Sequence, residues 1–217
     1  MRHTGAATKE NIVDAAIFLF NTKGFAGTSI REIAEKANAN IAHISYYFKG
    51  KNGLLEYLVS KFYEDYLCVI EQCLEQCLES PKECLKKVIK DILYYQFNNQ
   101  MLARFVHREV TLDSTLIRQV MTTYLAKEKY YFHKLLEHGI KAKELKKVDI
   151  AHFLAYLKSI LNMPFLQPQY LYEVLHINPY EEYFVKQYHQ QIISWLEQIL
   201  FAKKEEAIRL GACHLLK

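Results

Sequence analysis

Residues that interrupt helices are scarce in this chain of 217 residues, which contains only seven glycines and four prolines. An all-β fold needs a turn about every ten residues and builds most turns from these residue types. Apolar side chains that recur three and four positions apart over long stretches are instead typical of amphipathic helices. With 51% hydrophobic residues, such helices can bury a core. The sequence therefore predicts an all-α protein.

The first predicted helices are short and closely spaced. Ser29 and Glu32 form the capping-box pattern that starts a helix, and Asn40 is placed to cap the next one. Two short helices joined by a three-residue turn form a helix–turn–helix. These elements predict an N-terminal helix–turn–helix domain over residues 1–53, with helices over about residues 8–22, 30–37 and 40–47. The pattern alone fits a DNA-binding domain and an ordinary helical protein equally.

The rest of the chain is expected to form a larger helical domain over residues 54–201, followed by a tail over residues 202–217. Pro164, Pro168 and Pro179 are expected to separate helices, because proline lacks the backbone N–H that continues one. The helical spacing predicts helices over about residues 54–79, 82–98, 100–110, 114–140, 149–162, 170–176 and 181–200.

The cysteines and the charge pattern favour a protein of the cytoplasm. Five cysteines without a CxxC pair are expected to be free thiols in a reducing compartment. Charged residues interrupt the N-terminal stretch where a signal peptide has its apolar segment, and the longest uncharged stretch, residues 159–172, contains two prolines. Neither an export signal nor a membrane-spanning helix is expected.

The net charge of +4 is modest, so an affinity for nucleic acid has to come from local clustering. The second helix of a helix–turn–helix enters the major groove and presents its outward side chains to the DNA. In that helix Ile44 and Phe48 are four positions apart and are expected to face the core. The expected DNA contacts are Ser29, Ile30, Arg31, Asn40, Ile41, Ala42, His43, Ser45, Tyr46, Tyr47, Lys49 and Lys51.

The side chains of this set suit different contacts. The small Ala42 lets the helix approach the groove closely, and either Ala42 or Ile41 is expected to touch a thymine methyl group. Asn40 or His43 is expected to hydrogen-bond base edges or phosphates. The tyrosines and lysines suit phosphates, and Arg31 is placed for a further contact to the DNA backbone.

Many positions of the N-terminal domain follow one family signature in order and spacing: Ile12, Ala15, Ala16, Leu19, Phe20, Gly24, Phe25, Thr28, Ser29, Ile33, Ala34, Ala37, Ile44, Phe48, Lys51, Leu54 and Leu55. With them the chain resembles the TetR-type bacterial transcriptional regulators. The resemblance implies a homodimer in which residues 1–53 form the DNA-binding domain and residues 54–201 the regulatory and dimerisation domain. It implies that three N-terminal helices bind DNA, that a fourth helix connects the domains, and that the last two long helices make the dimer interface. The family usually has a tyrosine at Ser45 and a histidine at Tyr47, so Tyr46 or Tyr47 is expected to replace the usual phosphate contact at Ser45.

Further runs are similar to TetR-type regulators that act on the cell-division protein FtsZ in endospore-forming bacilli. This resemblance implies a DNA-bound, nucleoid-associated dimer that acts on FtsZ ring assembly and positioning near the chromosome origin. Its expected partners are double-stranded DNA with a near-palindromic site, a second copy of the chain, and FtsZ. The runs are Ile44–Lys51, Arg104–Val106, Arg108–Thr111, Asp113–Arg118 and Pro164–Tyr170.

Two apolar stripes and one basic cluster are candidate contact surfaces in the larger domain. Each stripe suits a dimer interface or an ordinary core, because aromatic enrichment marks interfaces only modestly. The arginine cluster suits an acidic protein partner or a solvated face with local ion pairs. The expected interface residues are Phe153, Leu157, Ile160, Tyr188, Ile192, Trp195 and Ile199, and the expected partner surface is Arg104, Arg108 and Arg118.

Signals for an enzyme are weak, and neither a catalytic residue, a metal nor a cofactor is expected. Tyr57 and Lys61 form a YxxxK pattern, but neither a GxGxxG motif nor a strand pattern accompanies it. Two acid–histidine pairs have the i,i+3 spacing of helical di-iron sites without the further glutamates that such a site needs. We interpret these pairs, Asp149 with His152 and Glu173 with His176, as solvated or capping pairs.

Aromatic residues are numerous in the larger domain, where they either line a ligand cavity or fill an ordinary core. The first possibility leaves open an alternative function, a transcriptional repressor that responds to a small molecule. The residues concerned are Tyr94, Tyr95, Phe97, Phe105, Tyr130, Tyr131 and Phe132.

Overall fold

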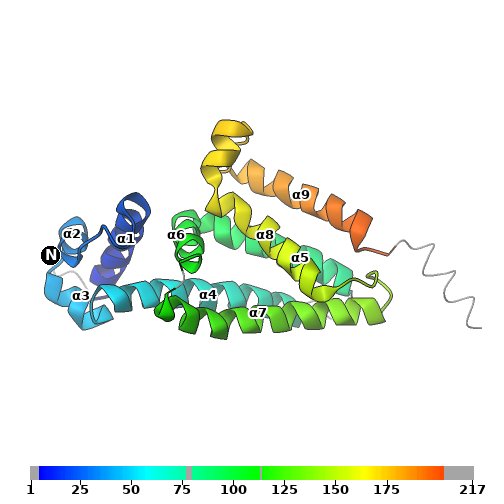
Figure 1. Ribbon diagram of the computed structural model, residues 1–217, viewed down its shortest axis with the longest axis horizontal. Coiled ribbons are helices and arrows are strands. Elements are labelled where there is room, and N and C mark those ends of the chain that lie inside the picture. The colour runs from blue at the N-terminus through cyan, green and yellow to red at the C-terminus, as the bar shows by residue number, and fades with distance from the viewer. Residues whose placement is uncertain (1–4, 77–79, 113, 203–217) are drawn as a thin grey trace, which may run out of the picture. The chain divides into compact units, whose positions relative to one another are not determined.

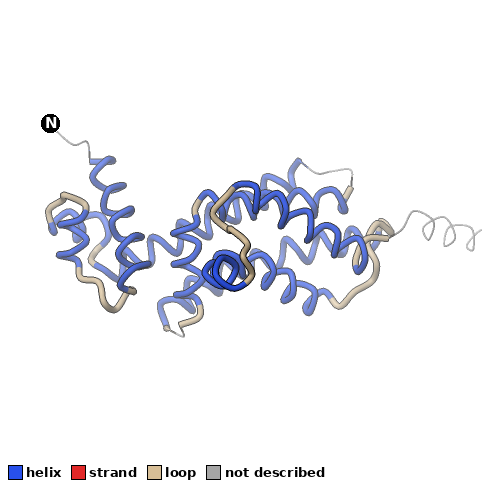
Figure 2. The backbone as a smooth tube through the Cα atoms, turned by 90° about the horizontal axis from the view of Figure 1, so that it is seen from above, coloured by secondary structure: helices blue, strands red, loops and turns tan. Residues whose placement is uncertain are grey.

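The computed structural model describes residues 5–76, 80–112 and 114–202 (Figure 1). In this part of the chain the backbone is helix and loop, as the tube in Figure 2 shows, and the all-α prediction is confirmed. The tail expected over residues 202–217 lies, apart from Ala202, outside the described residues. The elements are α1 (Gly5–Lys23), α2 (Ile30–Lys36), α3 (Ile41–Phe48), α4 (Lys51–Gln76), α5 (Pro81–Asn98), α6 (Gln100–Val110), α7 (Thr115–Lys141), α8 (Ile150–Leu166), the π-helix η1 (Tyr170–Val174) and α9 (Glu182–Ile199).

The chain divides into two compact units, and α4 and α7 each run from one unit into the other. The first unit spans residues 1–65 and 99–124, and the second spans residues 66–98 and 125–217. The first unit therefore extends beyond the domain expected over residues 1–53. The first unit includes α6 because this helix packs against α1, where the rings of Phe20 and Phe105 stack at 5.1 Å.

Local capping signals define the helix–turn–helix as the sequence predicts. The Ser29 hydroxyl accepts a hydrogen bond from the backbone N–H of Glu32, and the Glu32 carboxylate accepts one from the backbone N–H of Ser29. Asn38 adopts the left-handed conformation, at φ 49°, that turns the chain after α2. The Asn40 side chain then caps α3 by accepting a hydrogen bond from Ala42 N–H at 2.8 Å. Both caps are confirmed.

Two side-chain hydrogen bonds attach α6 to the C-terminal turn of α1. The Arg108 guanidinium donates at 2.5 Å to the backbone carbonyl of Phe20, which also accepts the backbone N–H of Gly24 at 3.1 Å. The Asn21 amide donates to the carbonyl of Met101 at 2.7 Å. Because these bonds come from both helices, α6 is held to the DNA-binding helices within the first unit.

In the second unit α5 packs against α8 and α9, and α8 continues through Pro164 to Leu166. The expected helix end near residue 162 is therefore wrong. Proline removes one helical hydrogen bond and leaves the carbonyl four residues earlier without its donor. The Tyr188 hydroxyl of α9 supplies that donor, to Ile160 O at 2.9 Å. The buried Gln96 amide donates to the next carbonyl, Leu161 O, at 3.1 Å, so tertiary contacts compensate for the proline.

Candidate DNA-binding site

Helix α3 places its two bulky apolar anchors inward. Ile44 is fully buried and Phe48 nearly so, as predicted. The ring of Phe48 lies 5.1 Å from the ring of Tyr57 at the start of α4, and the Lys9 ammonium of α1 lies 4.3 Å from the centre of the Tyr57 ring. These contacts fix the angle at which α3 leaves the core of the first unit.

The opposite face of α3 is open to solvent. Tyr46 is 80% exposed, and Ala42, His43 and Ser45 are exposed on the same helix. Ile41, at the first turn, is 37% exposed. An aromatic side chain left this open on a short helix costs hydrophobic free energy unless a partner covers it. The face therefore has the size, the chemistry and the exposure of a major-groove reader.

Tyr47 is more enclosed than the prediction assumed. Its side chain is half-buried, with the Tyr46 ring 5.0 Å and the His43 ring 6.2 Å from its own. A Cβ atom added to Gly5 would lie 3.0 Å from the Tyr47 hydroxyl, so the N-terminal end of α1 approaches this end of α3. Tyr47 is thus part of an aromatic cluster, and Tyr46 is the freer of the two for a phosphate.

Lys51 is engaged within the protein, although the sequence places it among the phosphate contacts. Its ammonium donates to the carbonyls of Phe25 at 3.0 Å and Thr28 at 2.8 Å, and lies 4.5 Å from the centre of the Phe25 ring. These bonds connect the start of α4 to the loop before α2. Lys49, by contrast, is exposed at the left-handed C-cap of α3 and offers its charge to the solvent side.

Arg31 is an exposed cation at the start of α2, and the neighbouring Ser29 side chain is engaged in the cap of this helix. The Ser29 hydroxyl bonds to Glu32 in the capping box. Hydrogen bonds from Lys23 and Ser29 lower the pKa of the Glu32 carboxyl to about 2, so it stays charged near neutral pH. Ile30 is half-buried and Asn40 uses its side-chain oxygen in the cap of α3.

The expected dimer-interface residues divide between core and surface. Phe153, Leu157 and Ile192 are buried inside the second unit, where they belong to its own core. The helical spacing of apolar residues could not distinguish a core residue from an interface residue, because both kinds of stripe have the same spacing. The residues of the set that keep solvent exposure are Ile160, Tyr188, Trp195 and Ile199.

The three arginines of the expected partner surface have different environments in the first unit. Arg108 is half-buried and bonded to Phe20 O, a role that sequence analysis missed because its partner lies 88 residues away. Arg104 is half-buried and Arg118 is exposed. Of the three, Arg108 has a positioning role within the fold.

The residues considered for an enzyme or a metal have structural partners. Asp149 caps α8 by accepting from His152 N–H at 3.0 Å, and Lys61 pairs with Asp65 at 2.7 Å. Burial raises the pKa of the Cys73 thiol to about 11, so this cysteine stays protonated. Among the described residues, no group of three His, Cys, Asp or Glu side chains is placed to hold a metal ion. No described helix has the length and apolar character needed to cross a membrane.

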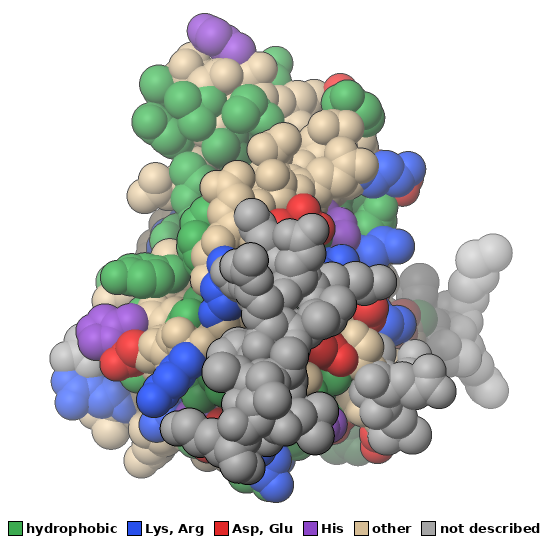
Figure 3. All heavy atoms as spheres, turned by 90° about the vertical axis from the view of Figure 1, so that its right-hand side faces the viewer, with side chains coloured by type: hydrophobic (Ala, Val, Ile, Leu, Met, Phe, Trp, Pro, Cys, Tyr) green, Lys and Arg blue, Asp and Glu red, His purple; other side chains and the backbone are tan. Residues whose placement is uncertain are grey.

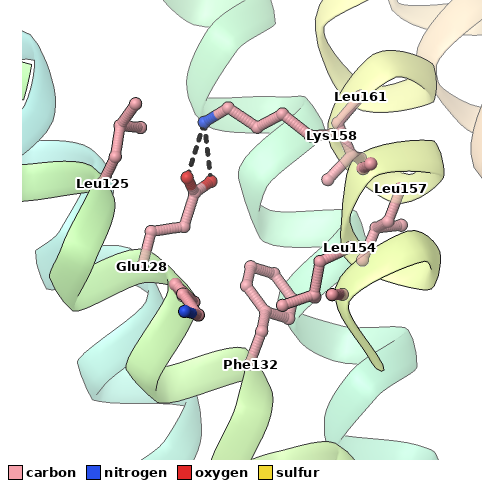
Figure 4. A pocket seen from close by; sticks show the side chains of 10 residues that line it. Leu125, Glu128, Phe132, Leu154, Leu157, Lys158 and Leu161 are labelled. Atoms are coloured by element: carbon pink, nitrogen blue, oxygen red, sulfur yellow. Dashed lines mark hydrogen bonds and ion pairs between the residues drawn. The ribbon is translucent and has the colours of Figure 1, made fainter. Parts of the chain in front are cut away.

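A pocket of about 330 Å³ lies between α7 and α8 (Figure 4). Glu128 of α7 and Lys158 of α8 form an ion pair at 2.6 Å at its edge, and the Tyr66 hydroxyl donates to Glu128 at 2.6 Å. The sequence contains no local signal for this group, whose members are 30 and 62 residues apart. The rest of the lining is mainly apolar: Leu125, Phe132, Ala151, Leu154, Ala155, Leu157 and Leu161, with Lys129.

A capped helix–turn–helix with an exposed second helix, followed by a helical unit, defines a DNA-binding protein of the helix–turn–helix class. Residues 12–58 match the model of the bacterial regulatory proteins, tetR family. Over 194 residues the chain is 52% identical to the probable HTH-type transcriptional regulator YttP of Bacillus subtilis (strain 168), covering 89% of this chain and 94% of that protein. The chain therefore belongs to the tetR family and is a TetR-type DNA-binding transcriptional regulator.

Solved structures share the fold along most of the chain. A tetR-family regulatory protein from Rhodococcus RHA1 has a TM-score of 0.71 at 17% identity, over 86% of this chain and 95% of that one. The transcriptional regulator FadR from Bacillus subtilis, in complex with stearoyl-CoA, has a TM-score of 0.65 at 20% identity, over 86% of this chain and 98% of that one. At these identities the comparisons show the fold.

Proposed function

We propose that the protein acts as a homodimer on a near-palindromic duplex, with α3 of each subunit in the major groove of one half-site. The observation that carries this proposal is the outward face of α3, above all Tyr46, which is 80% exposed. Ala42 and His43 on this face suit base edges, and Tyr46 and Lys49 suit phosphates. Lys51 acts indirectly, by holding the loop before α2.

The test is the affinity for an operator duplex, identified by genome-wide mapping of binding sites and measured at several salt concentrations. Tyr46→Ala and Lys49→Ala are expected to weaken binding to every duplex, and loss of Lys49 is expected to reduce the salt slope by about one per half-site. His43→Ala is expected to change the base preference. Lys61→Ala, on α4 and paired with Asp65, is the matched control. Unchanged affinity in a Tyr46/Lys49 double variant contradicts the assignment.

We infer that the dimer forms through α8 and α9, because the exposed side of α8 is uncharged. The one Lys, Arg, Asp or Glu residue in α8 is Lys158, and its ammonium pairs with Glu128 of α7. The exposed residues of α8 are Ala151, His152, Ala155, Tyr156 and Ser159, so the charge depletion concerns α8. The exposed positions of α9 include the uncharged Gln190, Gln191, Ser194, Gln198 and Ile199 and the charged Glu182, Lys186 and Glu197. Charge depletion of this kind is typical of the core of a protein interface.

Sedimentation of the unmodified protein at micromolar concentration is expected to show a dimer. Ile199→Glu is expected to yield folded monomers, since Ile199 is 39% exposed. Ile192→Glu is expected to unfold the second unit instead, since Ile192 is buried in its core. A monomeric unmodified protein contradicts the dimer.

We also propose that the DNA-bound dimer acts on FtsZ ring assembly near the chromosome origin, with Arg104 and Arg118 on the contact surface. The support is the resemblance of runs that extend past the DNA-reading helices, together with the exposure of Arg118. Charge reversal at Arg104 and Arg118 is expected to abolish an effect on the polymerisation of purified FtsZ while operator affinity stays unchanged. Arg108→Glu breaks the bond to Phe20 O and is expected to lower stability as well. The proposal fails if the unmodified protein leaves FtsZ polymerisation unaltered.

The pocket between α7 and α8 favours a second candidate function, a repressor that responds to a small molecule. Its volume of about 330 Å³ lies at the lower end of ligand sites, and its lining is apolar with one ion pair at the edge (Figure 4). Such a site suits a molecule with an apolar body and one polar group. Stearoyl-CoA is a defined probe, because the FadR structure contains it. A probe that lowers operator affinity, and loses this effect in Leu154→Trp, supports this function; an unchanged affinity argues against a response to that class of molecule.

A further inference from the structure

Exposed apolar side chains concentrate between α8 and α9. Fifteen large hydrophobic residues are exposed in the part of the chain that the structure describes, and seven of them lie within 14 consecutive positions. Figure 3 shows hydrophobic side chains gathered over this segment, at the top of the view. We call these residues the tyrosine patch: Tyr170, Tyr172, Val174, Leu175, Ile177, Tyr180 and Tyr183.

The backbone beneath the tyrosine patch carries hydrogen bonds within its own segment. The N–H of Ile177 donates to Leu171 O at 2.8 Å, and the Asn178 amide donates to the Glu181 carboxylate at 2.7 Å. The buried side chains of Leu171 and Pro179 anchor the segment to the second unit. Preformed surfaces bind with a smaller loss of conformational entropy than surfaces that must first be ordered. These hydrogen bonds and buried anchors favour a preformed surface.

The area of the tyrosine patch fits a subunit interface. A fully exposed aromatic side chain has about 200 Å² of accessible surface, and an aliphatic one has less. Multiplied by the exposed fractions of the seven residues, these areas give a total of roughly 600 Å² for the patch. This area is at the upper limit of apolar patches on monomers, which reach about 300–600 Å². A standard interface buries about 800 Å² on each partner. The patch supplies most of that area, and Tyr156 of α8 and Ile199 of α9, 58% and 39% exposed, add to it.

We propose that the tyrosine patch is covered by a second copy of this chain and continues the α8 and α9 interface around the end of the helix pair. The patch follows α8 in the chain and reaches the first turn of α9, where Tyr183 is 67% exposed, so it adjoins the uncharged exposed side of α8 and the start of α9. Glu173, Glu181 and Glu182 lie exposed among the tyrosines. Their charge disfavours an anionic lipid surface or a nucleic acid as the occupant. Tyrosine enrichment is typical of protein interfaces.

The test rests on the proposed dimer and measures its dissociation constant by sedimentation over a range of concentrations. The double variant Tyr172→Glu/Val174→Glu is expected to raise the dissociation constant at least a hundredfold. Both residues are more than half exposed, so the subunit is expected to stay folded. The matched control is Tyr130→Glu, an equally exposed tyrosine on α7, with an expected change below threefold.

Hydroxyl-radical footprinting of the unmodified protein gives a measurement that does not depend on a variant. Tyrosines of the patch are expected to be modified more slowly above the dimerisation concentration than below it, whereas Tyr130 is expected to react equally in both. A dimer whose patch tyrosines stay equally reactive, or whose double variant dissociates no more than the control, overturns this inference alone. A monomeric unmodified protein overturns the dimer and this inference together.

Discussion

The substitution Glu128→Leu tests whether the ion pair beside the α7–α8 pocket stabilises the second unit. The Glu128 side chain is 10% exposed and accepts hydrogen bonds from the Lys158 ammonium at 2.6 and 2.8 Å and from the Tyr66 hydroxyl at 2.6 Å. Leucine removes the acceptor that both donors share. Removing one member of a buried ion pair costs about 3–5 kcal/mol, because the remaining charge stays in a medium that solvates it poorly.

The exposure of Lys158 reduces this cost. Its side chain is 30% exposed, so water recovers part of the lost interaction, and we expect Glu128→Leu to cost about 2 kcal/mol. With a urea slope of about 2 kcal/mol per molar, this corresponds to a midpoint about 1 M lower. The double variant Glu128→Leu/Lys158→Met replaces both charges with apolar groups in an apolar lining. It is expected to recover most of the loss, because a buried pair and well-packed apolar groups of similar volume are often equally stable.

The measurement is the urea midpoint of the second unit, followed by circular dichroism for the unmodified protein and both variants. Lys186→Ala, at an exposed ion pair with Glu182 in the same unit, is the control and is expected to shift the midpoint by less than about 0.3 M, since exposed pairs contribute little. An unchanged midpoint in Glu128→Leu contradicts the reasoning. So does a double variant that is less stable than the single one, because the cost would then arise from packing rather than from the remaining charge.

Three further substitutions test single contacts. Lys51→Ala removes two hydrogen bonds to the loop before α2 and is expected to cost about 2 kcal/mol in urea unfolding, whereas the exposed Lys49→Ala changes stability little. Burial raises the pKa of the Glu109 carboxyl, so the folded state binds its proton more tightly than the unfolded state. The free energy of unfolding therefore falls as pH rises through the carboxyl range. Glu109→Gln replaces the carboxyl with an uncharged amide and is expected to raise the melting temperature at pH 7 but not at pH 4. Gly53→Ala would place a Cβ atom 1.8 Å from Phe48 O, and in an operator titration it is expected to abolish binding through displacement of α3.

The sequence predicts the elements whose causes are local. The capping box at Ser29, the left-handed turn at Asn38 and the cap at Asn40 depend on residues within four positions of each other, and all three are confirmed. The inward orientation of Ile44 and Phe48 follows from helical spacing alone. These signals suffice to predict the helix–turn–helix and the exposed face of α3.

Features that depend on distant residues could not be predicted in this way. Pro164 was expected to end a helix, but its cost is offset by Tyr188, which lies 28 residues from the carbonyl it bonds. Lys51 was assigned to phosphates because its charge and position fit, and its bonds to carbonyls 23 and 26 residues away carry no local signal. Phe153 and Ile192 lie on stripes whose spacing fits a core and an interface equally.

The short length of α3 makes its position depend on contacts outside it. A helix of eight residues is not stable alone, because the cost of helix nucleation is not recovered over so few hydrogen bonds. Its position is set by the Asn40 cap, the Phe48–Tyr57 ring contact and the Lys51 bonds. We therefore expect substitutions at these supports to reduce the population of the proposed reading conformation and to lower affinity for all duplexes alike. Ala42 and His43 are exposed, so we expect substitutions there to leave that conformation in place and to change base preference without loss of stability.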